Sequence, residues 1–382
     1  MAQHIRNLNI KTFRGIKNLE LDNLSDINIL VGANNCGKTS VLEATMMLSK
    51  PDDFYNVVSV ARLREAYRIG FRMNSSFFDS FLNLFNKLND ELLISVSGKI
   101  NNQNVSSIVK GRIEKVLIDL GEIMKQSPNF KKKNNDERIV ENEENDERIV
   151  ESEEIDNFSG EMQFISGENN LISDSNVIPI SINKYERFMR MERKTPFINM
   201  NFISTIDHIV KNTFSEIIRK KEFKNDVIDV LKLFDKNIAD LKIIQDEQGR
   251  VNQIIDNTLL NYMPLSTYGD GIKKVLALAN GIAEAKNGVL LVDEIETSIH
   301  SSVLKSVFSW LISACKEFNV QLFLTTHSIE TVDAMLNCNK SFINDDLIRV
   351  ITLVKKENQT VARILTGEKA LQVRDDYDME LR

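Results

Sequence analysis

The segment Gly32-Ala33-Asn34-Asn35-Cys36-Gly37-Lys38-Thr39 has the residue spacing of a phosphate-binding loop: glycine, four residues, then glycine, lysine and threonine. Glycines let the backbone wrap around an anion so that successive N–H groups face its oxygens. Lys38 can supply a point charge to the outer phosphates, and the hydroxyl of Thr39 can bind Mg²⁺. The apolar run Ile27–Val31 predicts a strand leading into the loop, and residues 38–49 predict a helix whose positive end faces the same anion. A glycine-rich turn can be purely structural, but the context on both sides favours a nucleotide site.

Two carboxylates end a second apolar run, Gly288–Glu294. A nucleotide site needs such a pair opposite its phosphate loop: Asp293 would hold Mg²⁺ through water, and Glu294 would orient or deprotonate the attacking water. Paired acids also occur as plain turn residues, and the upstream loop is what favours the functional interpretation. A further run, Gln321–Ser328, predicts another buried strand with His327 at its end, at the same edge of the sheet. A lone histidine there is usually structural, but the order of the motifs favours a functional one.

A serine and two glycines precede another helical pattern. Ser266, Gly269 and Gly271 lie just before a predicted helix, Ile272–Ala285, that is rich in Ala and Leu. At a helix start these residue types can form a second anion site. An ordinary capped turn explains the same residues, so local chemistry leaves both interpretations open.

Composition narrows the class of protein. No apolar run approaches the roughly 18 residues of a membrane helix, and Met1–Arg6 is not an apolar signal segment, so we expect a cytoplasmic protein without a membrane partner. Three well-separated cysteines and four scattered histidines predict neither a disulfide framework nor a metal cluster. The net charge of −7 is uneven, because residues 136–156 hold eleven Asp or Glu and two Arg and the remainder is close to neutral. The charge therefore decides nothing about DNA.

The chain divides into four parts by these patterns. Residues 1–50 form the N-terminal part of a nucleotide-binding head, with strands expected at 4–10 and 19–21. Residues 51–176 are a variable insertion, and residues 177–264 contain a strand, a helical pair and a hairpin. Residues 265–382 hold the glycine-bearing segment, the Asp-Glu strand and the histidine strand.

The insertion is expected to be mostly helical, because the phenylalanines at 77–85 follow helical spacing; Leu92–Val96 is its one good strand candidate. Within residues 131–156, Asp136–Glu141 recurs as Asp146–Glu151. This stretch is too charged to bury itself, so we expect a disordered or exposed loop enlarged by a local duplication. An acidic decoy or a partner-binding tail is the functional alternative.

The third part begins with a strand pattern at Val177–Ile182. Between Phe202 and Leu241 the apolar positions follow helical spacing and predict two antiparallel helices, whose apolar faces would serve the core or hold subunits together. The segments on either side of 248–250 alternate as in a hairpin.

In their order along the chain these motifs resemble those of the ABC-type ATPases of the SMC, RecF and OLD group, and in particular the stand-alone OLD-like ATPases of bacterial anti-phage defence. The resemblance covers about residues 1–50 and 177–382 and rests on Phe13-Arg14-Gly15, Gly32–Ser40, Gly269–Gly271, Asp293–His300 and Thr325–Ser328. It implies an α/β ABC-type head, with a mixed sheet around the phosphate-loop helix and the insertion beside it. ATP and Mg²⁺ are the cofactors that the resemblance implies.

The resemblance also assigns roles to residues. Lys38, Glu294 and His327 would act in hydrolysis as phosphate-binding lysine, general base and γ-phosphate sensor, and Thr39 and Asp293 would bind Mg²⁺. The nucleotide would contact Arg14, Gly32, Asn34, Asn35, Cys36, Gly37, Lys38, Thr39, Ser40, Ser266, Gly269 and Gly271. The signature segment departs from the usual Leu-Ser-Gly-Gly-Gln of the group, so Ser266 and the two glycines are alternatives for the contact there.

In this group the nucleotide lies between two subunits, with the loop of one facing the signature of the other. The resemblance therefore implies a homo-oligomer, either a dimer or a higher ring. OLD proteins carry a C-terminal Toprim nuclease, whereas the 55 residues after His327 are too few for one. We therefore expect an ATPase that controls a nuclease or toxin encoded nearby, with a phage protein as its trigger.

Two other functions compete with this expectation. A RecF-like DNA-binding ATPase of DNA repair is the main alternative, and DNA would then be the partner. An ATP-binding transporter subunit fits less well, because the Phe13-Arg14-Gly15 start, the Thr325–Ser328 strand and the signature differ from those of transporters.

Overall fold

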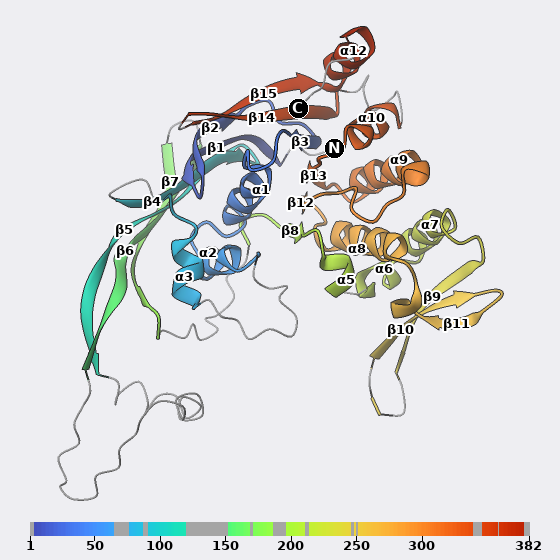
Figure 1. The fold of residues 1–382 in the computed structure, drawn as a ribbon, viewed down its shortest axis with the longest axis horizontal. Coiled ribbons are helices and arrows are strands. Elements are labelled where there is room, and N and C mark those ends of the chain that lie inside the picture. Colours follow the sequence, from blue (N-terminus) through green and yellow to red (C-terminus); the bar gives the residue numbers. More distant parts are fainter. Residues whose placement is uncertain are drawn as a thin grey trace, which may run out of the picture.

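The computed structural model describes residues 4–64, 76–86, 91–119, 152–168, 171–185, 196–210, 214–245, 248–249, 251–338, 346–357 and 359–377. Two β-sheets enclose helix α1 (Lys38–Met47), and a layer of further helices covers the outer face of the central sheet (Figure 1). The expected α/β head with a mixed sheet around the phosphate-loop helix is confirmed.

In the described ranges the central sheet has six strands in the spatial order β15-β14-β3-β13-β12-β8. These are β15 (Gln359–Thr366), β14 (Ile348–Lys356), β3 (Ile27–Val31), β13 (Gln321–Thr325), β12 (Val289–Val292) and β8 (Met200–Ile203). Neighbours are parallel except for the antiparallel pair β14–β15. The carboxyl ends of β3, β13 and β12 therefore meet at one edge, where ligands bind in open parallel sheets.

Strands of the central sheet are covered on both faces. In β3, Ile27 and Ile29 pack toward the helical layer, whereas Leu30 packs toward α1 and the second sheet. A strand that is buried on both faces has a continuous apolar sequence rather than an alternating one. This is why the short runs before the phosphate loop and before Asp293 were recognisable in the sequence.

The second sheet is antiparallel, and its described strands follow the order β2-β1-β4-β5-β6-β7. They are β2 (Ile16–Leu21), β1 (Ile5–Phe13), β4 (Leu92–Ile100), β5 (Gln103–Asp119), β6 (Ser152–Glu168) and β7 (Leu171–Asn183). The long strands β5 and β6 extend away from the body (Figure 1). Because β7 runs across residue 176, the insertion and the segment after it share this sheet.

The prediction of a mostly helical insertion is wrong for the described residues of 51–176. Helices α2 (Phe54–Ala61) and α3 (Phe77–Leu82) are short, and most of the remainder is strand. In β4 only alternate residues such as Ile94 and Val96 are buried, with Ser95, Ser97 and Lys99 between the buried positions. Such one-sided burial gives a weak apolar signal, so the helical spacing of the phenylalanines dominated the sequence pattern.

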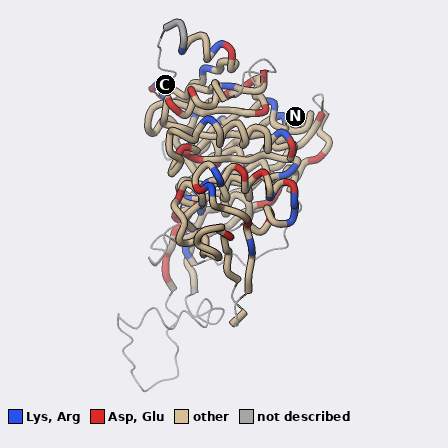
Figure 2. Tube along the Cα trace, turned by 90° about the vertical axis from the view of Figure 1, so that its right-hand side faces the viewer, with Lys and Arg blue, Asp and Glu red and all other residues tan. Residues whose placement is uncertain are grey.

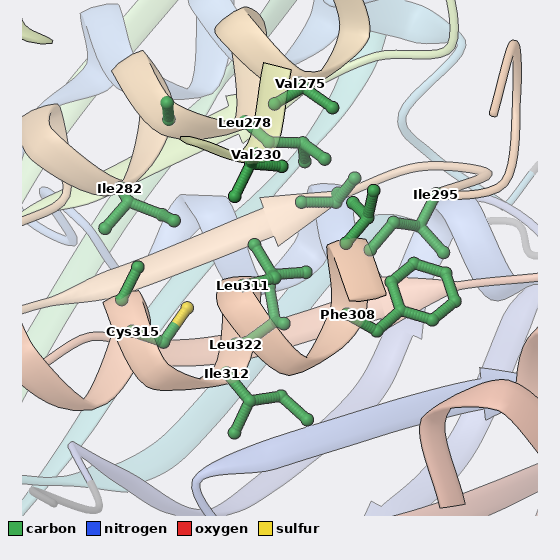
Figure 3. Packing of buried hydrophobic residues seen from close by; sticks show 14 of the residues in the cluster. Val230, Val275, Leu278, Ile282, Ile295, Phe308, Leu311, Ile312, Cys315 and Leu322 are labelled. Atoms are coloured by element: carbon green, nitrogen blue, oxygen red, sulfur yellow. The ribbon is translucent and has the colours of Figure 1, made fainter. Parts of the chain in front are cut away.

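Helices on the outer face of the central sheet build the larger core. They are α5 (Asp207–Val210), α6 (Ser215–Ile218), α7 (Lys221–Leu231), α8 (Asp270–Glu284), α9 (Ser301–Glu317) and α10 (Ile329–Asn337). Figure 3 shows Leu278 and Ile282 of α8 packed close to Leu311 and Cys315 of α9, above Leu322 of the sheet. Helix α12 (Gly367–Tyr377) follows the last strand, and the short 3₁₀ helix η2 (Leu265–Thr267) precedes α8.

The prediction of two antiparallel helices between Phe202 and Leu241 is also wrong. Its described residues, 202–210 and 214–241, contain the end of β8, three helices of which only α7 exceeds one turn, and the start of β9 (Ile238–Gln245). Phe214, Ile217 and Val227 are buried in the core of the same chain, whereas Ile209 and Leu233 are exposed. Short elements that each contribute a turn to one core keep the helical spacing of a longer helix.

The expected hairpin around 248–250 is confirmed by β9 and β10 (Val251–Asn257), and β11 (Asn261–Pro264) completes a three-stranded sheet. Both copies of the acidic duplication, Asp136–Glu141 and Asp146–Glu151, lie outside the described residues. The last residues of the acidic stretch 131–156, residues 152–156, begin β6 and include the buried Ile155, so this end is not an exposed loop. No helix in the described part of the chain is long and apolar enough to span a membrane.

Candidate nucleotide site

The phosphate loop connects β3 to α1 and has the backbone that its glycines predicted. Positive φ angles occur at Gly32 (140°), Asn35 (61°) and Gly37 (104°). A Cβ atom at Gly32 would lie 2.4 Å from the carbonyl oxygen of Leu353, so a side chain cannot be placed there without moving the backbone. The glycine spacing thus has a steric cause in the fold.

The side chain of Lys38 is buried and folds back over the loop. Its Nζ donates hydrogen bonds to the carbonyl oxygens of Gly32 (2.7 Å) and Ala33 (3.0 Å) and lies 3.4 Å from Nδ1 of His327. Burial lowers the pKa of Lys38, and neighbouring acidic groups act in the opposite direction. Phosphate oxygens in the loop would favour the charged amine in the same way as those acidic groups.

Asp293, at the end of β12, joins the phosphate loop to the neighbouring strand ends. Its carboxylate oxygens accept hydrogen bonds from Oγ1 of Thr39 (3.0 and 3.2 Å) and from Oγ1 of Thr325 (2.7 Å). Oγ1 of Thr325 in turn accepts a hydrogen bond of 2.8 Å from the backbone N–H of Glu294. The structure therefore brings the two predicted Mg²⁺ ligands, one hydroxyl and one carboxylate, into direct contact. Oxygen ligands of this kind suit Mg²⁺.

Glu294 and His327 lie side by side beyond Asp293. The backbone of Glu294 has a φ of 45°, a left-handed conformation that is uncommon for a residue with a side chain and that clusters at functional sites. Oε1 of Glu294 lies 3.7 Å from Nε2 of His327. The backbone N–H of His327 donates to Oε1 of Glu296 at 2.9 Å. Since Nδ1 of the same imidazole faces Lys38, the histidine connects the lysine to the carboxylate.

A cavity of about 570 Å³ opens between these residues. It is lined by Arg14, Gly15, Ile16, Asn34, Asn35, Cys36, Gly37, Lys38, Thr39, Ser40, Arg64, Glu294, His327 and Lys355. Its size suits a small-molecule ligand. Most residues that the sequence pointed to therefore meet in one cavity, while Gly32 and Asp293 support its wall.

Arg14 is held at this cavity by a fully buried carboxylate. Nε of Arg14 lies 2.8 Å from Oε2 of Glu43, and Nε of Arg64 lies 2.7 Å from Oε1 of the same carboxylate. The guanidinium of Arg64 also donates to Oγ of Ser40 at 3.1 Å. Two positive groups beside one negative group leave a net positive charge next to the phosphate loop.

Several residues of the site were missed in the sequence. Arg64 and Lys355 line the cavity, but neither belongs to a sequence motif. Glu43 holds Arg14, and Glu296 accepts a hydrogen bond from His327. Glu43 carries the one usable signal, because a charged residue in the apolar helix after the loop is unusual unless it is paired. Lys274 was also missed: it is fully buried, and burial lowers its pKa to about 8.

The signature residues lie apart from this cavity. Ser266, in η2, and Gly269, just before α8, are exposed, and Gly271 is half-buried. None of these three residues lines the nucleotide cavity of its own chain. The structure therefore unites the phosphate loop, the Asp-Glu pair and His327, and leaves the signature outside.

A phosphate loop, an acidic strand end and a histidine strand end on adjacent parallel strands define a P-loop ATPase of the ABC type. The described residues agree with this class in strand order and in the contact between Thr39 and Asp293.

Comparisons with known proteins identify the family. A family model described as "AAA domain, putative AbiEii toxin, Type IV TA system" matches residues 27–333, and the chain belongs to this family. It is similar to an ATP/GTP phosphatase of Helicobacter pylori, with 24% identity over 381 residues that cover 95% of this chain and 96% of the relative. It is also similar to the DNA replication and repair protein RecF of Francisella tularensis subsp. novicida, with 34% identity over 105 residues, 28% of this chain and 27% of RecF. The protein is thus a P-loop ATPase of this AAA family, with a segment similar to part of RecF.

Among solved structures, the chain is similar to an SMC head bound to the C-terminal winged-helix domain of ScpA. That likeness has a TM-score of 0.47 at 14% identity and covers 96% of this chain and 99% of the other.

Proposed function

We propose that this ATPase is the sensor or scaffold of a bacterial anti-phage defence system and controls a nuclease or toxin on another chain. The family description, which includes a putative toxin of a type IV toxin–antitoxin system, supports a place in such a system. The described residues after His327 form α10, β14, β15 and α12, and the two strands extend the central sheet. This part of the chain therefore belongs to the ATPase head.

One observation carries the hydrolytic part of the proposal: the carboxylate of Asp293 is hydrogen-bonded to both Thr39 and Thr325, so three elements converge on it. Thr39 and Asp293 would hold Mg²⁺, which in such sites neutralises charge on the phosphates. The described residues contain no group of three or more His, Cys, Asp or Glu that could bind a metal. Phosphate oxygens and water would therefore complete the coordination, as is usual for Mg²⁺.

The residues around the cavity would then divide the work of ATP hydrolysis. Lys38 would exchange its bonds to the loop carbonyls for bonds to the β- and γ-phosphates. Glu294, which is 43% exposed at the cavity, would accept the proton of the attacking water. His327 would contact the γ-phosphate from its place between Lys38 and Glu294. Arg14 and Arg64 would add positive charge where the phosphates develop negative charge.

The position of the signature supports a homo-oligomer. Ser266, Gly269 and Gly271 lie outside the cavity of their own chain, so a nucleotide that contacts both sides would be shared between two copies. A two-fold dimer satisfies this arrangement with two equivalent sites, and higher rings can be assembled from such dimers.

The defence role is tested by purifying the tagged protein from its native host during phage infection, with and without nuclease treatment. A nuclease or toxin should co-purify and withstand nuclease treatment, and a phage protein should join it on infection. Glu294→Gln and Lys38→Ala should abolish protection against phage in a plating assay. Recovery of DNA alone, together with unchanged phage growth, would show that the defence role is wrong.

RecF-like DNA repair is the second candidate, and the 105-residue similarity to RecF is the observation that favours it. Positions of Lys and Arg are interspersed with those of Asp and Glu over the side of the molecule in Figure 2, so charge does not favour DNA. Binding of duplex and single-stranded DNA with and without ATP decides this point. ATP-dependent DNA binding with a steep dependence on salt would support the repair role.

A further inference from the structure

A fully buried lysine, Lys274, lies next to the Asp293–Glu294 pair on the second turn of α8. Its Nζ donates a hydrogen bond of 3.4 Å to the backbone carbonyl oxygen of Glu294. The carboxylates of Glu296, Asp293 and Asp207 also favour its charge. Burial of an ammonium group is unfavourable unless acceptors and negative charges compensate for it. An apolar residue would fill the same space without that cost, so packing alone does not account for a lysine here.

The loop from Glu294 to Ser298 rests on the helical layer at further points. A Cβ atom at Gly271 would lie 3.0 Å from the carbonyl oxygen of Ser298, so the backbones of α8 and the loop are in close contact. Nε2 of the buried His208, on α5, lies 3.0 Å from Oγ of Ser298. The far end of the loop is therefore fixed by α5 and the start of α8, and Lys274 is the contact that α8 makes at the Glu294 end.

Glu294 has a backbone conformation that needs such support. Left-handed φ angles in residues with side chains persist where the surroundings hold them. The N–H of Glu294 is held by Thr325, and its carbonyl oxygen accepts hydrogen bonds from the backbone N–H of Thr297 at 3.1 Å and from Lys274. The two peptide groups on either side of its Cα atom are thus both held, with Lys274 adding a side-chain donor to the turn bond on the carbonyl side, and together they set the direction of the carboxylate.

We propose that Lys274 is a positioning residue for ATP hydrolysis, which rests on the proposed role of Glu294 as general base. Its amine fixes the carbonyl side of Glu294 and keeps the carboxylate directed into the cavity. Gly269 directly precedes α8, and Gly271 lies in its first turn. The contact between Lys274 and Glu294 therefore connects the signature helix to the general base within one chain. If the signature residues moved, α8 would move Lys274 and with it the backbone of Glu294.

The variant Lys274→Met keeps the length of the side chain and removes the donor. Turnover should fall about 10- to 100-fold, because displacement of a reacting group by about 1 Å has effects of this size. Affinity for a non-hydrolysable ATP analogue should stay within about twofold, since a group that acts only in the chemical step does not set ground-state binding. The melting temperature is measured in parallel, because removal of the ammonium group leaves the carboxylates of Glu296, Asp293 and Asp207 without its charge and so destabilises the buried site.

Lys273→Met is the matched control on the same helix. Nζ of Lys273 pairs with Asp270 at 3.1 Å instead of with the loop, so turnover should change by less than about twofold, as for most substitutions away from a site. Lys274→Gln, whose amide can still donate to the carbonyl group, should retain more turnover than Lys274→Met and provides a second variant if the first is unstable.

A double variant separates positioning from a structural role. In a Glu294→Gln background, Lys274→Met should have no further effect on turnover, because the group that it positions is absent. The proposal is overturned if Lys274→Met turns over at the wild-type rate, if it lowers ATP-analogue binding and melting temperature along with turnover, or if the two changes add. Undiminished turnover in Glu294→Gln alone would instead refute the general base, so the two failures are distinguishable.

Discussion

The phosphate-loop side of the nucleotide site and its signature side differ in how much of their surroundings one chain supplies. On the phosphate-loop side, Lys38, Thr39 and Asp293 have hydrogen-bond partners within the chain and border a cavity. On the signature side, Ser266 and Gly269 are exposed, and a Cβ atom at Gly269 would meet no atom within 4 Å.

The two sides of the site meet different structural requirements. The groups proposed to bind phosphate and move a proton are held by hydrogen bonds within the chain, as preorganised catalysis requires. A surface that binds a ligand held by another copy has to remain open in the single chain. Substitutions can test whether one chain supplies the catalytic groups of the phosphate-loop side, and whether the signature side needs a second copy of the chain.

The largest effect is expected from Glu294→Gln, which tests whether the first side contains the catalytic base. Glutamine keeps the shape and the hydrogen bonding of the side chain but cannot accept the proton, so turnover should fall by about two orders of magnitude or more. ATP should still bind, as measured by calorimetry. Glu317→Gln, at the exposed end of α9, is a control that should turn over normally. Turnover at the wild-type rate in Glu294→Gln would exclude this residue from the mechanism.

Lys38→Ala should act on binding. The buried amine is the nearest positive charge to the loop carbonyls, and loss of a charge-assisted contact to phosphate should weaken ATP binding about 10- to 100-fold. Calorimetric titration measures this change, with Lys305→Ala on the exposed side of α9 as control. If Lys38→Ala binds ATP as tightly as the wild type, the phosphates do not lie in this loop.

Gly269→Ala tests the open side with little risk to the fold. Its φ of −65° suits alanine and nothing in the chain would touch the new methyl group, so the melting temperature should not change. If a nucleotide on a second copy approaches this backbone closely, turnover should fall about tenfold, the effect of losing about 1.4 kcal/mol of transition-state stabilisation. Wild-type turnover should also rise with protein concentration, in step with the mass measured with and without ATP. A monomer that hydrolyses ATP at a rate independent of concentration would refute the shared site.

The smallest effect is expected from Cys36→Ser. Cys36 lies within the phosphate loop and is 5% exposed. Because serine is of similar size, turnover should stay within about twofold of the wild type. Reactive thiols are accessible to solvent, and this one is largely covered. Oxidant treatment should therefore inhibit wild type and Cys36→Ser equally, with Cys338→Ser as control. Protection by Cys36→Ser alone would reveal redox control at the loop.

The sequence predicted the phosphate-loop side more completely than the rest of the molecule. Strands buried on both faces have continuous apolar sequences, and the loop needs glycine where the backbone of Leu353 approaches, so both features were visible without the fold. The second sheet was less visible because only alternate residues of β4 are buried, and residues 77–85 suggested helix instead. Between Phe202 and Leu241, the periodicity showed which residues enter the core, but it did not show where each short helix ends.

By itself the sequence predicted the nucleotide site, because the residue types around Lys38 and at Asp293–Glu294 are those that phosphate and metal geometry requires at fixed local spacing. Only the tertiary structure decided which distant residues complete the site. Arg64, which follows α2, forms an ion pair with Glu43 of α1. Lys355 lies on β14, the strand beside β3, and Lys274 contacts the backbone of Glu294 from α8. These contacts depend on how strands and helices pack, and packing joins residues that have no fixed distance along the chain.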